Sequence, residues 1–122
     1  MRENKSINKR TVGSKYEQAA GEFLIDKGYR IIAYNYRCKL GEIDIIALDG
    51  DELVFVEVKY RASSRYGSPM EAVDYRKQNK IYMVANYYLM EQHISKYTKV
   101  RFDVVGILGK EITLIKNAFG GM

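Results

Sequence analysis

The chain has little cysteine and histidine and no long apolar run. Its 122 residues include one cysteine, Cys38, and one histidine, His93. A lone cysteine excludes a disulfide within the chain and a metal site built from several thiolates. His93 falls near the end of a predicted helix, where it is interpreted as a partner of the helix dipole and not as a catalytic base. No run approaches the roughly 18 apolar residues that a membrane span needs. A secretory signal requires an apolar stretch after its first charged residues, and this chain has none there. These absences predict a cytoplasmic protein without a membrane partner.

The composition predicts one globular domain preceded by a basic arm. Hydrophobic residues make up 47% of the chain, which is typical of a folded protein, and the length fits one domain with a modest core. The net charge is +5. Five basic residues and one acidic residue place +4 of it in residues 1–15, which leaves +1 for the rest. We therefore expect residues 1–12 to form a flexible arm, which either contacts phosphates or only aids solubility, and residues 13–122 to form a single domain.

Periodicity predicts the order helix, three strands, helix, two strands. The expected elements are a helix at 13–27, strands at 29–37, 42–47 and 53–59, a helix from 68 to about 92, and strands at 99–108 and 111–116. Ser68, Pro69 and Glu71 form a capping box for the second helix, and Asp74 is an alternative start. This order predicts an α/β fold with one mixed central sheet flanked by helices, whose fourth strand can return parallel to a strand of the meander.

The strongest functional signal is a set of charges inside two predicted strands that are otherwise rich in β-branched and aromatic residues. Asp44 lies in one strand, and Glu57 and Lys59 lie in the next. Side chains alternate along a strand, so Glu57 and Lys59 point the same way. Asp44 is directly opposite Glu57 if Gly50 and Asp51 form the turn, and diagonal to it if the turn starts one residue earlier. In either case the three charges share one face.

Two carboxylates that face each other across a strand pair repel, so their presence in the two predicted strands calls for a compensating interaction. Their Cβ atoms would be about 5 Å apart, and at an effective dielectric of about 20 their repulsion costs about 3 kcal/mol. Lys59 offsets part of this cost, and Mg²⁺ or Mn²⁺ would offset it fully. The alternative to a metal site is an ordinary solvent-exposed face of a hairpin that carries a cross-strand ion pair. Ile46, Leu48 and Phe55 make one end of the face apolar, which favours a covered face with the charges at its open edge.

Four further charges are candidates for the same site. Glu17 borders the apolar stripe of the first helix and Lys77 extends that of the second, so both are expected where a helix meets the sheet. The alternatives are a partner of the helix dipole for Glu17 and a lysine that covers apolar surface for Lys77. Arg37 and Arg61 carry guanidinium groups suited to phosphate, and Arg61 is two residues past Lys59. Either arginine is alternatively an edge-strand charge that prevents aggregation.

These residues carry a family resemblance. Asp44 followed by Glu57-Val58-Lys59 resembles the PD-(D/E)xK signature of the restriction-endonuclease-like nucleases, with Ile43 in place of the proline. The longer pattern is similar to the YraN family, small bacterial proteins predicted to be nucleases related to archaeal Holliday-junction resolvases. The matching segments are 35–37, 41–47, 55–61, 66–67, 101–105 and 115–119. The resemblance covers nearly everything after residue 12.

The resemblance implies a restriction-endonuclease-like αβββαβ core and a Mg²⁺-dependent (or Mn²⁺-dependent) endodeoxyribonuclease. Such an enzyme would hydrolyse phosphodiester bonds in DNA, with branched or recombination and repair intermediates as candidate substrates. The implied metal ligands are Asp44, Glu57 and the main-chain carbonyl of Val58. Lys59 would position or activate the attacking water, and Glu17 would support a second metal or its water shell. The role of holding flanking phosphates falls to the basic residues Arg37, Arg61 and Lys77.

Other interpretations stay open at this stage. The same fold could serve as a non-catalytic module that binds nucleic acid or protein, or the basic arm could attach the chain to a membrane surface or scaffold. A homodimer is an alternative to a monomer, because junction-cutting relatives cut two symmetric strands. Tyr82, Tyr87 and Tyr88 of the second predicted helix, together with the last predicted hairpin, could supply its interface. Alternatively, the tyrosines could form a partly solvated surface.

Overall fold

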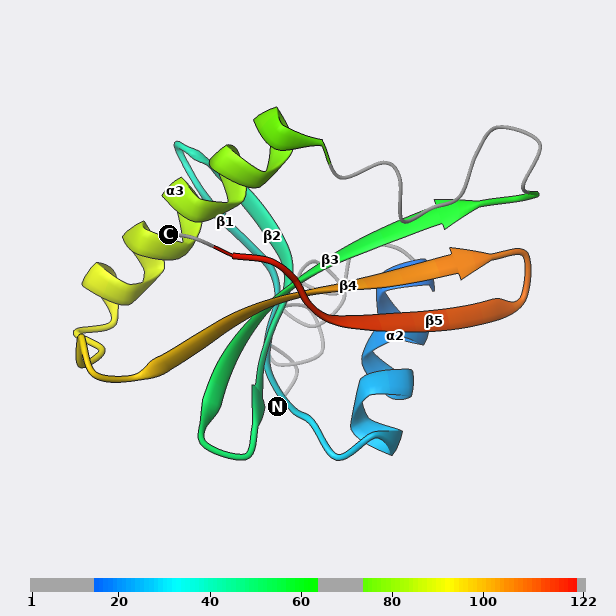
Figure 1. Ribbon diagram of the computed structural model, residues 1–122, viewed down its shortest axis with the longest axis horizontal. Coiled ribbons are helices and arrows are strands. Elements are labelled where there is room, and N and C mark those ends of the chain that lie inside the picture. The colour runs from blue at the N-terminus through cyan, green and yellow to red at the C-terminus, as the bar shows by residue number, and fades with distance from the viewer. Residues whose placement is uncertain (1–14, 64–73, 121–122) are drawn as a thin grey trace, which may run out of the picture.

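In the computed structural model, which describes residues 15–63 and 74–120, five strands form one mixed sheet with a helix on each face (Figure 1). The elements in chain order are α2 (Lys15–Asp26), β1 (Arg30–Cys38), β2 (Gly41–Asp49), β3 (Glu52–Arg61), α3 (Tyr75–Glu91), β4 (Lys99–Leu108) and β5 (Glu111–Phe119). The strands lie side by side in chain order. Among the strand pairs that the described residues form, β3–β4 is parallel and the other three are antiparallel. The predicted order of elements and the parallel return of the fourth strand are confirmed. No helix within the described ranges is long and apolar enough to cross a membrane.

The start of α3 and the end of β5 differ most clearly from the expectation, while the bounds of β1, β2 and β3 differ from it by one or two residues. α3 begins after Asp74, whose side chain accepts a hydrogen bond from the Lys77 amide at 2.9 Å. The alternative helix start is thus confirmed, while the capping box at Ser68 and the basic arm at 1–12 lie outside the described residues. β5 continues to Phe119, past the predicted end at residue 116, because the strand bulges. Asn117 at the bulge has a φ of 53°, and pairing resumes at Phe119.

The sheet separates two apolar cores. On one face α3 buries its predicted stripe, Ile81, Val84, Ala85 and Tyr88, against a cluster that includes Phe55. On the other face α2 packs Ala20 and Leu24 against Val54, Val56 and neighbouring residues. Because side chains alternate along β3, Glu57 and Lys59 continue the row of Leu53 and Phe55 that faces α3.

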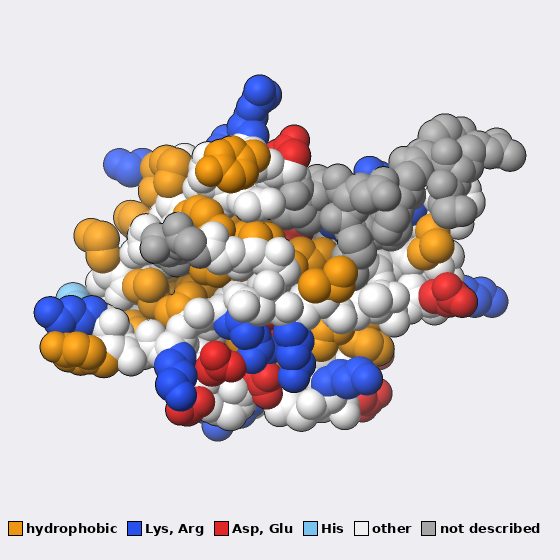
Figure 2. Space-filling view, viewed as in Figure 1, with side chains coloured by type: hydrophobic (Ala, Val, Ile, Leu, Met, Phe, Trp, Pro, Cys, Tyr) orange, Lys and Arg blue, Asp and Glu red, His pale blue; other side chains and the backbone are white. Residues whose placement is uncertain are grey.

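Exposed apolar residues also mark α3. Figure 2 shows hydrophobic side chains gathered over this helix, and Tyr75, Met83 and Met90 are exposed on it. Tyr88 is buried and lies edge-on to the ring of Phe55. It therefore belongs to the core and is not available for the interface considered from the sequence.

The β2–β3 hairpin has the register expected for a Gly50-Asp51 turn, since Asp49 pairs with Glu52. The pairing ends at Ile45 and Val56, and beyond this point β1 and β2 diverge from β3 toward α3 (Figure 1). Asp44 therefore lies just past the last pair, at the place where the two strands separate.

The side-chain alternation of β1 and β2 also changes at this place. Ile45 belongs to the core under α2, whereas Ile43, two residues away, belongs to the core under α3. Their partners Tyr34 and Tyr36 divide in the same way. Asn35 lies between these tyrosines with a φ of 51°, in the left-handed region that asparagine tolerates better than most residues. The strict period-two rule thus fails in the segment that contains Asp44.

Candidate metal centre

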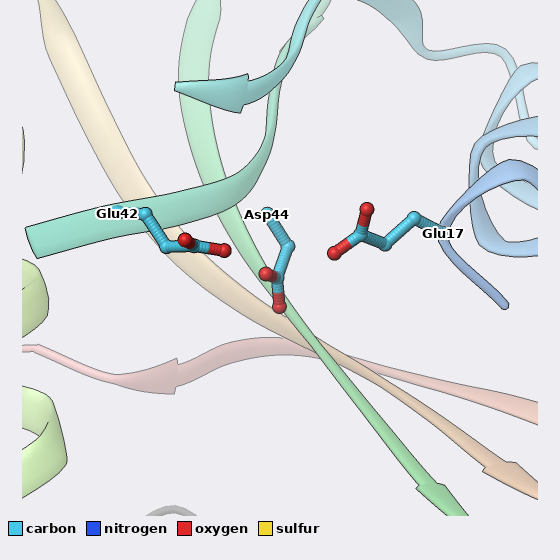
Figure 3. Close-up of side chains that lie close together, drawn as sticks. All are labelled: Glu17, Glu42 and Asp44. Atoms are coloured by element: carbon cyan, nitrogen blue, oxygen red, sulfur yellow. The ribbon is translucent and has the colours of Figure 1, made fainter. Parts of the chain in front are cut away.

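Three carboxylates from two elements converge where β2 leaves β3 (Figure 3). Glu42 and Asp44 come from β2, and Glu17 comes from the first turn of α2. One oxygen of each carboxylate lies within 4.8 Å of the others, and Glu17 and Glu42 extend toward Asp44 from opposite sides in Figure 3. Oxygen ligands of this kind are those that Mg²⁺ and Mn²⁺ prefer, so the donor set fits such an ion. We refer to Glu17, Glu42 and Asp44 as the acidic trio.

Asp44 carries the clearest electrostatic sign of a cation site. Its Oδ2 accepts a hydrogen bond from the Val58 amide at 2.8 Å, which fixes the carboxylate in the gap between the strands. Burial, followed by the negative charge of Glu57, raises the pKa of Asp44 to about 8, and Glu17 adds to the rise. The Val58 amide acts in the opposite direction but is outweighed. A negative charge at Asp44 is therefore poorly compensated by the described protein groups, and a bound cation would compensate it.

Two contacts bring Glu17 to this position. The buried Asn35 donates a hydrogen bond from Nδ2 to Oε1 of Glu17 at 2.6 Å. Next to Glu17, the ring of Tyr16 stacks on Tyr60 with the centroids 3.9 Å apart. The stack ties the first turn of α2 to the end of β3, and the hydrogen bond orients the carboxylate.

Glu57 belongs to a separate cluster on the α3 side. Its carboxylate is buried, and its Oε2 lies 3.2 Å from Nζ of Lys59 and 3.3 Å from Nζ of Lys77. The structure thus brings together three residues that the sequence marked as site candidates. Glu57 is not part of the acidic trio, but its charge acts on Asp44. The two clusters are therefore adjacent, one acidic and the other dominated by ammonium groups.

The remaining candidates lie around these clusters. Val58 is two residues beyond the last β2–β3 pair. The N–H and C=O of one strand residue point to the same edge, so the Val58 carbonyl also faces the gap. Arg37 forms an exposed ion pair with Glu42, with 3.1 Å between Nε and Oε1. Arg61 donates a hydrogen bond to the carbonyl of Tyr60 at 3.4 Å, and within the described ranges it has no ion pair with either cluster.

Sequence reasoning missed two residues of this site, Glu42 and Asn35. Glu42 stands two residues before Asp44 on the same strand, and that spacing was the available signal. Asn35 appeared only inside a segment that resembled the family. Nothing in its local pattern indicated a left-handed backbone or a hydrogen bond to a helix residue 18 positions earlier.

Comparison with known proteins shows that the part of the chain that forms both clusters is similar in sequence to proteins of one family. The model of the uncharacterised protein family UPF0102 matches residues 16–107. A UPF0102 protein of Lachnoclostridium phytofermentans is 50% identical over 113 residues, covering 93% of this chain and 96% of the relative. One from Caldanaerobacter subterraneus subsp. tengcongensis is 47% identical over 103 residues, covering 84% of each chain. One from Fusobacterium nucleatum is 44% identical over 115 residues, covering 94% and 96%. The matched segment contains both clusters.

Proposed function

The chain belongs to the uncharacterised protein family UPF0102, the YraN family, and we propose that it is a Mg²⁺- or Mn²⁺-dependent endonuclease that hydrolyses phosphodiester bonds in DNA. The observation that carries the proposal is the convergence of the acidic trio beside the Glu57–Lys59 ion pair. A cation site next to an ammonium group is a combination suited to metal-assisted phosphodiester hydrolysis, because both stabilise negative charge that develops on the phosphate. The αβββαβ order and the mixed sheet support a restriction-endonuclease-like core as the finer description of the fold.

The acidic trio would hold the ion, with the Val58 carbonyl as a further oxygen ligand at the same gap. When bound, a divalent ion supplies a water of lowered pKa and positive charge for the scissile phosphate. Asp44 is the central ligand because the Val58 amide already orients it. Asn35 supports the site indirectly, since its hydrogen bond directs Glu17 toward the ion position.

The ammonium cluster would act on the phosphate and on the attacking water. Lys59 would donate a hydrogen bond to that water or to a phosphate oxygen and stabilise the charge that develops there. Glu57 holds Lys59 and Lys77 in place through ion pairs at 3.2 and 3.3 Å. Arg61 would hold a flanking phosphate through its planar guanidinium group.

We expect the purified protein to nick DNA in Mg²⁺ or Mn²⁺ and not in EDTA. The assay uses linear duplex, flapped and four-way branched substrates of the same sequence, so that the nicking rates on the three substrates show which DNA shape the protein prefers. Lys59→Gln should lose the cutting, because it removes the ammonium group but not the acidic trio. Lys110→Gln, at the exposed β4–β5 turn, is the matched control and should cut normally. Salt-sensitive binding without cutting in either metal would instead support a non-catalytic binding module.

The ligand set can be tested separately by measuring Mn²⁺ affinity calorimetrically. Glu42→Gln should weaken Mn²⁺ binding by about tenfold or more, by comparison with the losses seen even for supporting residues of metal sites. Glu57→Gln should cause a smaller loss, because two lysines already neutralise the Glu57 carboxylate. Equal losses would assign Glu57 as a direct ligand, as the sequence predicts. Unchanged affinity in Glu42→Gln would remove Glu42 from the site.

A further inference from the structure

A pocket of about 360 Å³ lies beside the acidic trio, between β1–β2 and the first half of α3. Three cations and one carboxylate line it, together with apolar or small residues. The cations are Arg37, Lys77 and Lys80, and the carboxylate is Glu42. Three positive charges minus one negative charge leave +2, so the pocket is suited to a compact anion. Glu42 belongs both to the pocket wall and to the acidic trio, which places the pocket next to the proposed ion.

Lys80 is the pocket cation with the least compensated charge. Arg37 is paired with Glu42, and Lys77 is paired with Glu57. Within residues 15–63 and 74–120 no carboxylate forms an ion pair with Lys80. An anion entering the pocket would therefore meet an ammonium group that is free to bind it.

The backbone of β2 at Gly41 lies next to the side chain of Lys80. Gly41 has a φ of 148°, and a Cβ added there would lie 3.2 Å from Val84 Cγ2 and 3.4 Å from Lys80 Cγ. The β2 backbone at Gly41 thus runs close to α3 beside the aliphatic stem of Lys80, and a side chain in place of Gly41 would crowd both Val84 and Lys80. A lysine can lay its aliphatic stem along such a surface while its ammonium group stays in solvent, where an anion can reach it.

We propose that this pocket binds one phosphate of the DNA strand, adjacent to the phosphate that is cut, with Lys80 as its principal cation. For the identity of the ligand this inference rests on the proposed function. Arg37 and Lys77 complete the cation set, and Glu42 opposes the anion in the absence of metal. The charges predict effects of opposite sign. Removing Lys80 weakens DNA binding, and removing the charge of Glu42 strengthens it when no metal is present.

The test measures DNA binding in EDTA, where cutting plays no part. A labelled flapped duplex is titrated with the full chain at several KCl concentrations. Lys80→Gln should lower the affinity and reduce the slope of log affinity against log salt by about 1, the effect of losing one phosphate contact. Glu42→Gln should raise the affinity at the same salt. Lys110→Gln, at the exposed turn between β4 and β5, should match the wild type. Circular dichroism of each variant checks that the fold is retained.

The outcomes separate this inference from the proposed function. An unchanged slope in Lys80→Gln, weaker binding in Glu42→Gln, or no binding of the duplex by the wild type would each overturn the phosphate pocket. A wild type that binds through Lys80 but does not cut in Mn²⁺ would retain the pocket and overturn the nuclease.

Discussion

Asp44→Asn is expected to abolish metal-dependent cutting and, in the same molecule, to stabilise the metal-free fold. Burial and the charge of Glu57 raise the pKa of Asp44 from the ordinary value of 3.8 to about 8, so the folded state disfavours the ionised carboxylate. Asparagine has nearly the same shape, can still accept the hydrogen bond from the Val58 amide, and carries no charge. We expect its free energy of unfolding in EDTA at about pH 8 to exceed that of the wild type by about 2 kcal/mol or more.

The sign of the pH dependence follows from the raised pKa. The folded chain holds the Asp44 proton more tightly than the unfolded chain does, so the stability from this group is full below a pH of about 4. It is lost as the pH rises toward about 8. Urea unfolding in EDTA should therefore show a difference between Asp44→Asn and the wild type that grows from about pH 4 to about pH 8. Glu111→Gln, an exposed acid at the start of β5, is the control and should show no such trend.

Manganese should reverse the order of stability. Binding of Mn²⁺ to the folded state should stabilise the wild type by mass action, whereas Asp44→Asn lacks the proposed central ligand and should gain little. A variant that is less stable than the wild type at about pH 8 in EDTA would contradict the inference that the charge of Asp44 is poorly compensated in the metal-free fold. A variant that still binds Mn²⁺ with wild-type affinity would remove Asp44 from the ion site.

Local signals in the chain were sufficient to predict most of the fold. The Gly109-Lys110 turn, the β-branched runs and the stripe of α3 each depend on residues close in sequence, and each is found as predicted. The Gly50-Asp51 turn is one of the two turns that the sequence left open for the β2–β3 hairpin. Continued pairing in the register of this turn would place Asp44 opposite Glu57, but the pairing ends at Ile45 and Val56, so both carboxylates lie beyond the last pair. A short segment was enough for these inferences because the interactions that determine them are short-range.

The arrangement of the site needed information that local patterns lack. The alternation rule assumes continuous pairing, but β2 pairs with β3 only from Ile45 to Asp49. The part of β2 before Ile45 is separated from β3 and lies next to the left-handed Asn35. This separation turns Asp44 toward Glu17 and Glu42 and leaves Glu57 with its lysines. The residue types were therefore predictable, whereas their grouping depended on tertiary structure.

The same limit explains why no role was predicted for Arg101 and Asp103. Asp103 is fully buried and accepts hydrogen bonds from Arg101 at 2.9 and 3.0 Å, from the Tyr29 hydroxyl at 2.7 Å and from the Asn117 amide at 2.9 Å. These contacts join β4 to the start of β1 and to the bulge of β5. Tyr29 is 74 residues away in the chain, so no sequence window contains the network.

The Arg101 guanidinium also connects this buried network to acidic residues near the surface. It pairs with Asp49 at 2.8 Å and with Glu52 at 2.5 Å, and the hydrogen bonds of Asp103 raise the pKa of Arg101 above its ordinary value. At the rim, Lys116 lies 3.6 Å from Asp49, and Figure 2 shows basic side chains lying against acidic ones on this part of the surface. The network therefore contains charged side chains from the core to the surface, and Arg101 and Asp103 form its buried central pair.

Arg101→Met is expected to lower the free energy of unfolding by about 3 to 5 kcal/mol, because it leaves the buried charge of Asp103 without its cation. Replacing both members in Arg101→Met/Asp103→Leu should recover part of this loss, since no uncompensated charge then remains. Arg30→Met, which replaces an exposed arginine at the start of β1, is the control and should change stability by less than about 0.5 kcal/mol. Urea unfolding at neutral pH measures all three. If the single variant lost less than about 1 kcal/mol, or the double variant were no more stable than the single one, the loss could not be assigned to a stranded buried charge, and the network would matter only through its packing.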